Sequence, residues 1–132
     1  MTKKVLLAED DSDDRILFQT FFSDRKDISL LQPVINGLEL IECLMNIPAD
    51  HDLPDLIILD QNMPKMNGKQ TLSYLKSNKR YANIPVVIYS TYTDNTLVVD
   101  CKKLGAVMVA VKPIDNEGYQ RMMDDFLRVI LS

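Results

Sequence analysis

The sequence has little of what marks several protein classes. Its 132 residues include no Trp, one His, two Cys and four Gly, and the longest purely apolar run is Ala106–Val111. A bilayer-spanning helix needs about 20 apolar residues. A secretory signal needs an apolar run of about 7–15 residues, and the N-terminus offers only Val5–Ala8. We therefore expect no membrane segment, no signal peptide and a cytoplasmic location.

The scarce metal-binding residue types are poorly placed for that role. Cys43 and Cys101 lie in helix-like segments without metal-ligand spacing, which favours free, buried thiols over a disulfide or a zinc site. His51 lies in the polar loop Ala49–Pro54 and is predicted to be exposed rather than a ligand.

Negative charge is concentrated near the N-terminus. The net charge is −4, yet five acids fall within six residues and the rest of the chain sums to +1. These acids are Glu9, Asp10, Asp11, Asp13 and Asp14. No excess of Lys and Arg is visible, so we expect no nucleic-acid binding. The length indicates one domain.

Short apolar runs alternate with helix-period segments. The expected strands are Lys4–Ala8, Leu30–Val34, Leu56–Leu59, Val86–Tyr89 and Ala106–Val111. The expected helices are Ser12–Phe22, Leu38–Asn46, Lys69–Ser77, Asn95–Leu104 and Asn116–Leu131, with Gly105 as the residue that ends the fourth. Continuously apolar strands suit a parallel sheet covered on both faces. Five βα units predict an α/β fold with a doubly wound five-stranded parallel sheet, flavodoxin-like, in strand order 2-1-3-4-5.

Ligands bind such sheets at the carboxyl ends of the strands. The first strand delivers Glu9 and Asp10, the third Asp60, the fourth Ser90 and Thr91, and the fifth Lys112. Carboxylates at one edge raise one another's pKa unless a cation intervenes, and Mg²⁺ prefers such oxygen ligands. Carboxylates, metal, hydroxyl and ammonium together suit phosphoryl transfer, with Asp60 as the best nucleophile.

The other acids have a simpler interpretation. Asp11 or Ser12 can cap the following helix, and Asp13 and Asp14 then lie in its first turn, where the helix dipole favours negative charge. Tyr74, Tyr81 and Tyr89 show no base-stacking arrangement and are expected to pack in the core or at its edge.

Five segments, taken together, resemble the receiver domain of two-component response regulators. They are Val5–Asp11 (VLLAEDD), Pro54–Pro64 (PDLIILDQNMP), Met66–Gly68 (MNG), Ile84–Ser90 (IPVVIYS) and Val111–Pro113 (VKP). The resemblance covers the chain from Lys4 to the last helix. It implies a single stand-alone receiver over 1–132, of the chemotaxis-regulator type, with no output domain.

The resemblance also implies a role for each site residue. Asp60 accepts a phosphoryl group from a phosphohistidine of a sensor histidine kinase or phosphotransfer protein. Mg²⁺ is held by Asp10, Asp60 and the backbone carbonyl of Asn62, with Glu9 acting through water. Lys112 pairs with the phosphoryl oxygens, and its bond to Pro113 is expected to be cis. Ser90 and the Thr91 amide bind the phosphoryl group.

The implied protein is a signalling switch rather than an enzyme. Movement of the Ser90 loop repacks the fourth helix and passes the signal to a protein partner, and a homodimer through the fourth and fifth helices is compatible with the family. Val109 occupies the usual aromatic switch position, so the coupling must run differently here. Asn62 and Tyr92 occupy positions that tune phosphate lifetime, and we expect Tyr92 to slow attack by water.

Three other functions compete with this one. Asp11-Ser12-Asp13 imitates the motif of a small Mg²⁺-dependent aspartate-nucleophile phosphohydrolase, but lies beyond the strand end. A degenerate, unphosphorylated interaction module is disfavoured because the active-site positions are intact. A flavodoxin needs a Ser-, Thr- and Gly-rich phosphate loop, whereas Glu9–Asp14 is acidic.

Overall fold

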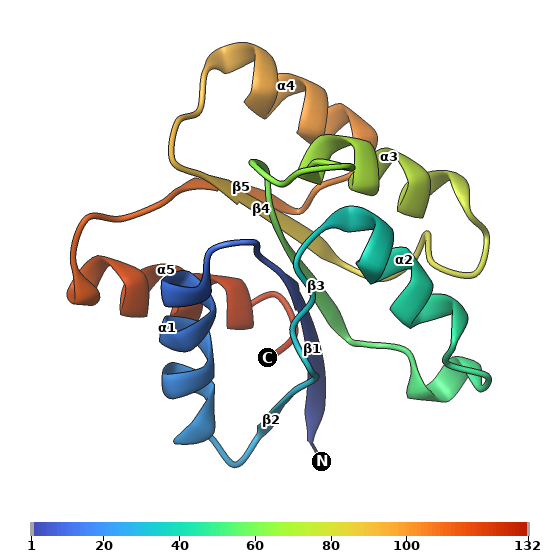
Figure 1. The fold of residues 1–132 in the computed structure, drawn as a ribbon, viewed down its shortest axis with the longest axis horizontal. Helices are drawn as coiled ribbons and strands as arrows, with labels where there is room; N and C mark the ends of the chain where they lie inside the picture. Colours follow the sequence, from blue (N-terminus) through green and yellow to red (C-terminus); the bar gives the residue numbers. More distant parts are fainter. Residues whose placement is uncertain (1, 132) are drawn as a thin grey trace.

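The computed structural model describes residues 2–131, so Met1 and Ser132, the ends of the predicted 1–132 domain, lie outside the described residues. Within them, strands and helices alternate along the chain (Figure 1). The strands are β1 (Lys3–Ala8), β2 (Ile28–Leu30), β3 (Leu56–Asp60), β4 (Val86–Ser90) and β5 (Met108–Val111). The helices are α1 (Ser12–Ser23), α2 (Gly37–Met45), α3 (Gly68–Ser77), α4 (Asn95–Leu104) and α5 (Asn116–Leu127), with a short 3-10 helix at Asp50–Asp52.

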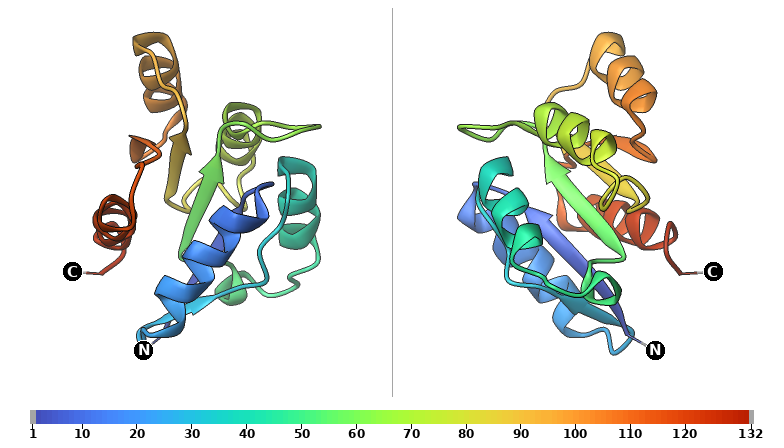
Figure 2. Two further views of the ribbon diagram at one scale, coloured as in Figure 1. Left: turned by 60° about the vertical axis from the view of Figure 1, so that its left-hand side comes forward. Right: turned by 90° about the vertical axis from the view of Figure 1, so that its right-hand side faces the viewer.

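The strands form one parallel sheet in the order β2-β1-β3-β4-β5. Helices α1 and α5 cover one face, and α2, α3 and α4 cover the other (Figure 2). The predicted fold class and strand order are therefore confirmed. This order places the carboxyl ends of β1, β3, β4 and β5 side by side.

The core is divided by the sheet into two layers. On β1, Leu6 and Ala8 pack toward α2 and α3, whereas Val5 and Leu7 pack toward α1 and α5. All four side chains are fully buried. Because successive strand residues point to opposite faces and both faces are covered, the strands have no polar alternation.

Helix α4 is the least embedded of the covering helices. Its buried residue is Cys101, and Leu97 and Leu104 are only partly buried, whereas α5 buries six residues. A salt bridge of 2.8 Å between Lys69 Nζ and Asp100 Oδ2 joins α4 to α3. Helix α4 therefore buries less of its side chains than α5 does.

Two elements end four residues earlier than the sequence predicts, and the other bounds differ by at most two residues. The second strand is Ile28–Leu30 rather than Leu30–Val34, with an isolated bridge between Ala8 and Val34. Pro33 lies between the two pairings, and proline has no N–H to donate to a ladder. The last helix ends at Leu127 instead of Leu131, and the chain continues as turns.

The helix termini follow the side-chain chemistry of their flanking residues. Each α-helix begins after an Asp or Asn whose side chain accepts backbone N–H groups, namely Asp11, Asn36, Asn67, Asp94 and Asp115. Gly105 ends α4 with φ of 110°, which confirms its predicted role.

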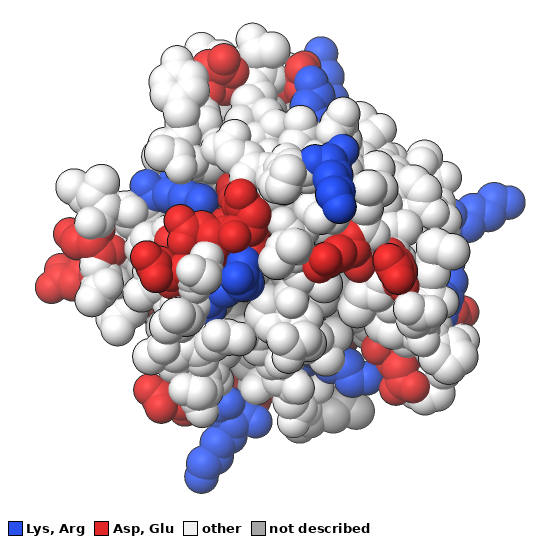
Figure 3. Space-filling view, viewed as in Figure 1, with Lys and Arg blue, Asp and Glu red and all other residues white. Residues whose placement is uncertain are grey.

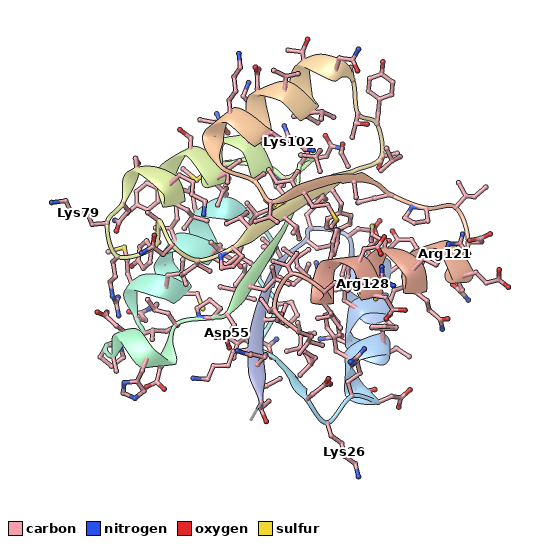
Figure 4. The ribbon with its side chains drawn as sticks, turned by 180° about the vertical axis from the view of Figure 1, so that it is seen from behind. Lys26, Asp55, Lys79, Lys102, Arg121 and Arg128 are labelled. Carbon is pink, nitrogen blue, oxygen red and sulfur yellow. The ribbon has the colours of Figure 1, made fainter. Side chains whose placement is uncertain are left out.

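Cys43 and Cys101 are free thiols, and Cys101 is buried whereas Cys43 is half-buried, which confirms the absence of a disulfide between them. The His51 side chain is 85% exposed, as predicted. No helix among residues 2–131 combines the length and apolar character needed to cross a bilayer. From behind, the basic side chains labelled in Figure 4 lie apart from one another, and Lys79 and Lys26 project from the edge of the molecule.

Candidate functional site

Polar side chains from four neighbouring strands meet at the carboxyl edge of the sheet. Glu9 follows β1, Asp60 ends β3, Ser90 ends β4 and Lys112 follows β5. Glu9, Asp60 and Ser90 are each at most 1% exposed, so the strand ends fix their positions. Acidic side chains also gather on the surface over the β1–α1 loop (Figure 3). The predicted meeting of Glu9, Asp60 and Lys112 is confirmed by their contacts.

Three carboxylates form a compact cluster. One oxygen from each of Glu9, Asp10 and Asp60 lies within 4.8 Å of the others, with Glu9 and Asp60 buried and Asp10 exposed. Carboxylates this close repel one another unless a proton or a cation intervenes. Burial, and then the hydrogen bonding and charge of Glu9, raise the pKa of Asp60 to about 8. The donor set suits a hard divalent cation with oxygen ligands.

Lys112 provides the positive charge beside these acids. Its Nζ lies 3.5 Å from Asp60 Oδ2, 3.2 Å from Glu9 Oε1 and 3.1 Å from Asp14 Oδ2. Burial alone would lower the pKa of Lys112, but the charges of Asp60 and Glu9 outweigh it and raise that pKa. Lys112 is therefore an ammonium that can bind an anion attached to Asp60.

Tyr89, on β4, connects Glu9 with Lys112. Its phenol O–H donates a hydrogen bond to Glu9 Oε1, and Lys112 Nζ lies 5.0 Å from its ring centroid. Burial, followed by the charge of Glu9, raises the pKa of Tyr89 well above its usual value. The phenol thus remains a hydrogen-bond donor, and the ring face supports the ammonium.

The loops after β3 and β4 are joined by hydrogen bonds. The Asn62 N–H donates to Asp60 Oδ1 at 3.1 Å, and its side-chain amide donates to Ser90 Oγ at 3.2 Å. Ser90 Oγ donates in turn to the Tyr92 carbonyl oxygen at 2.8 Å. Thr91 is exposed, and the Tyr92 side chain is 75% exposed. In this state the Ser90 hydroxyl is directed to its own loop.

The acids of the first helical turn have two different roles. Asp11 accepts the N–H groups of Asp13 and Asp14 at 2.8 and 3.3 Å, which confirms its predicted capping role. Asp14, assigned from the sequence only to the helix terminus, also binds Lys112 and accepts a hydrogen bond of 3.0 Å from the Tyr119 hydroxyl. The prediction for Asp14 was therefore incomplete.

Sequence reasoning missed Asp14 and Tyr89 as neighbours of Lys112, and Tyr119 as the partner of Asp14. A usable signal existed for Asp14, because it lies in the first turn of a helix that begins at the carboxyl end of β1, the sheet edge at which Lys112 was also expected. Tyr89 carries a polar group on an otherwise apolar central strand, a group that needs a buried partner. Tyr119 gave no such signal, since its spacing fits the apolar face of α5.

The Lys112–Pro113 peptide bond corrects the prediction. No cis peptide bond occurs among residues 2–131, so this bond is trans. Val111 and Ile114 beside it are exposed, which marks an open loop rather than the tight turn in which cis proline is typical. The trans form is the intrinsically favoured one for such bonds.

Gly68 sets how closely α3 approaches the phosphoacceptor candidate. A Cβ at this position would lie 2.8 Å from the Asp60 carbonyl oxygen and 3.0 Å from Gln61 Cα. We expect Gly68→Ala to cost about 1–3 kcal/mol of unfolding free energy, because the backbone must shift. Urea unfolding measures this cost, and binding of beryllium fluoride, a phosphoryl mimic, with Mg²⁺ measures the displacement of Asp60.

A control for Gly68→Ala lies far from the acids. Gly105→Ala is strained by its φ of 110° and is expected to lose about 1 kcal/mol. It should lose stability while keeping its affinity for beryllium fluoride. Equal losses of affinity in both variants would mean that Gly68 affects the site only through overall stability.

The chain is similar in sequence to known signalling proteins. Residues 5–124 match the family model of the response regulator receiver domain. Sporulation initiation phosphotransferase F of Bacillus subtilis is 30% identical over 127 residues, which cover 96% of this chain and 95% of that protein. A protein-glutamate methylesterase/protein-glutamine glutaminase of Clostridium acetobutylicum is also 30% identical, over 96% of this chain but 35% of that protein. The chain spans about a third of the length of this and two further such relatives.

The fold is similar to those of solved response regulators. The phosphorylated cyanobacterial phytochrome response regulator RcpA has a TM-score of 0.89 and 27% identity, covering 100% of this chain and 96% of that chain. The Mn²⁺-bound form of response regulator Rcp1 has a TM-score of 0.81 and 26% identity, covering 95% of this chain and 91% of that chain.

Proposed function

Since this chain belongs to the response regulator receiver domain family, we propose that it is a phosphorylation-activated switch whose phosphoacceptor is Asp60. The observation that carries the proposal is the contact of 3.5 Å between Lys112 Nζ and Asp60 Oδ2, beside the carboxylates of Glu9 and Asp10. A buried carboxylate with an ammonium beside it can become an acyl phosphate whose added negative charge the ammonium compensates.

The proposed donor is a phosphohistidine of a sensor histidine kinase or phosphotransfer protein. An Asp60 oxygen attacks the phosphorus, the phosphorus–nitrogen bond breaks, and the electron pair stays on the histidine nitrogen, which takes up a proton. Lys112 binds an oxygen of the transferred group. The similarity to a phosphotransferase over nearly the full length of both proteins supports a donor of this kind.

The acidic cluster fits Mg²⁺, which we include in the proposal. Asp10, Asp60 and the Asn62 carbonyl would hold it directly, and Glu9 through water. When bound, the cation neutralises the carboxylates and the incoming phosphoryl oxygens. Glu9 suits an indirect role, because its oxygens already receive hydrogen bonds from Tyr89 and the Asp11 N–H. The similarity to a Mn²⁺-bound response regulator supports a divalent cation here.

The proposed output passes through the loop between β4 and α4. Ser90 would exchange the Tyr92 carbonyl for a phosphoryl oxygen, and the Thr91 N–H would donate to the same group. The loop would then pull on α4, whose buried residue is Cys101. Val109 offers no aromatic ring to transmit this movement, so α4 itself is the proposed carrier of the signal to a protein target.

The proposed setting is the cytoplasm. The two free thiols are compatible with a reducing compartment. The downstream target is a protein, and a homodimer through α4 and α5 remains part of the proposal. The methylesterase activity named for the longer relatives is not carried over to this chain.

Labelling stoichiometry tests the proposed function. Incubation with acetyl phosphate and Mg²⁺ should label one site per chain, without sustained release of phosphate from added phosphomonoesters. Mass spectrometry and phosphate release measure the two quantities. Sustained turnover would instead indicate a phosphohydrolase.

Tyr92 is the proposed determinant of phosphate lifetime. Tyr92 is 75% exposed in this state, and we expect movement of the β4–α4 loop to bring it over Asp60. We expect Tyr92→Ala to speed autodephosphorylation about two- to fivefold, because less apolar surface would exclude water. Decay of the phosphorylated mass after removal of the donor gives the rate. An unchanged rate would remove Tyr92 from this role.

A further inference from the structure

Lys112 is shared among three carboxylates, and one of them is outside the proposed phosphorylation site. Its Nζ lies nearer to Asp14 Oδ2, at 3.1 Å, than to Asp60 Oδ2, at 3.5 Å. The side chain of Asp14 is 17% exposed, and Asp14 does not belong to the acidic cluster of Glu9, Asp10 and Asp60. Asp14 therefore binds the ammonium without being placed to bind the cation.

The carboxylate of Asp14 is held in position from its other side. The Tyr119 hydroxyl, on α5, donates to Asp14 Oδ1 at 3.0 Å. Tyr119 is 8% exposed, and its ring packs edge-on against Phe18 at 6.5 Å between centroids. With Tyr119 on one oxygen and Lys112 on the other, Asp14 cannot turn toward solvent without losing both contacts.

We propose that Asp14 is a positioning residue that competes with the phosphoryl group for Lys112. This inference rests on the proposed function. A phosphoryl group on Asp60 brings new negative oxygens that require the ammonium, and Lys112 must loosen its contact with Asp14 to bind them. Asp14 then keeps Tyr119 as its partner while its charge faces another anion. Asp14 therefore favours the unphosphorylated state and lowers the fraction of phosphorylated protein that adopts the activated conformation.

Affinity for beryllium fluoride at saturating Mg²⁺ tests the competition, because this anion mimics the phosphoryl group without being hydrolysed. We expect Asp14→Asn to bind it about three- to tenfold more tightly, since Lys112 is released. Asp13→Asn is the matched control. It removes the same charge one residue away, from an exposed side chain, and should change the affinity less than about twofold. Amide chemical shifts of the β4–α4 loop report binding.

Tyr119→Phe separates competition from structural damage. It removes the hydroxyl and keeps the ring, so Asp14 depends more on Lys112 and gives it up less readily. The affinity for beryllium fluoride should fall about two- to fourfold. In the Asp14→Asn background the same change should have no effect. A general loss of packing would not tighten the binding of beryllium fluoride in Asp14→Asn while weakening it in Tyr119→Phe.

Three results would overturn the proposal. Equal changes of beryllium fluoride affinity in Asp14→Asn and Asp13→Asn would mean that only the overall charge matters. Weaker binding by Asp14→Asn would mean that Asp14 helps to bind the anion. Tyr119→Phe acting equally in both backgrounds would break the link through Asp14. These failures leave the proposed function standing if the wild-type protein binds beryllium fluoride. A wild-type protein that binds none would overturn both.

Discussion

Asp60→Asn is expected to abolish phosphorylation by acetyl phosphate. The amide retains the shape of the carboxylate but is a poor nucleophile and cannot carry the charge that Mg²⁺ and Lys112 compensate. We expect labelling to fall by at least about 100-fold, which corresponds to about 2.7 kcal/mol of lost transition-state stabilisation. Mass spectrometry of the intact protein follows a labile increase equal to one phosphoryl group.

A matched charge control accompanies this variant. Asp13→Asn also removes one negative charge near the site, from an exposed side chain, and should be labelled like the wild type. Thermal unfolding verifies that Asp60→Asn folds. A labile label that persists in Asp60→Asn at the wild-type level would place the phosphoacceptor elsewhere.

Removal of Mg²⁺ is expected to have the second large effect, and to depend on pH. Burial and the neighbouring Glu9 raise the pKa of Asp60 to about 8, so the metal-free pair of Glu9 and Asp60 holds a proton at pH 7. A cation must displace that proton, so the apparent Mg²⁺ affinity should rise about tenfold per pH unit from pH 6 to 8 and level off above. Chelation with EDTA should lower labelling by about 100-fold at pH 7.

The same proton links stability to pH. The pKa of Asp60 is higher in the folded than in the unfolded chain, so its contribution to stability is fully present below about pH 4 and is lost as the pH rises through about 8. Without Mg²⁺, the wild type should lose up to about 1.4 kcal/mol per pH unit relative to Asp60→Asn over this window. Urea unfolding with EDTA measures the difference. A difference that does not change with pH would mean that Asp60 is ionised throughout.

The sequence was most informative where chain topology alone decides the outcome. Continuously apolar strands indicated a sheet covered on both faces, and the strand order then brought Glu9, Asp60 and Lys112 together without knowledge of any side-chain contact. The first and last residues of β2 could not be predicted from the apolar pattern. Pro33 interrupts the pairing, and the apolar pattern continues across it.

Residues that act across elements were harder to predict. Tyr89 and Tyr119 look like core residues in a linear sequence, because their rings are indeed buried. Their hydroxyl groups donate hydrogen bonds to carboxylates of the site, Tyr89 to Glu9 and Tyr119 to Asp14. Such pairings depend on the packing of α1, α5 and β4 at the level of single side chains, which periodicity does not encode. The state of the Lys112–Pro113 bond likewise depends on the surrounding loop.

The small buried surface of α4 has a consequence for local unfolding. A helix with Cys101 as its buried residue and one salt bridge to α3 can open without exposing much of the core. Its amide hydrogens should therefore exchange with solvent well before those of α5, through a local rather than a global opening. A change at the strand ends that moves the β4–α4 loop would then act on an element whose local stability is low.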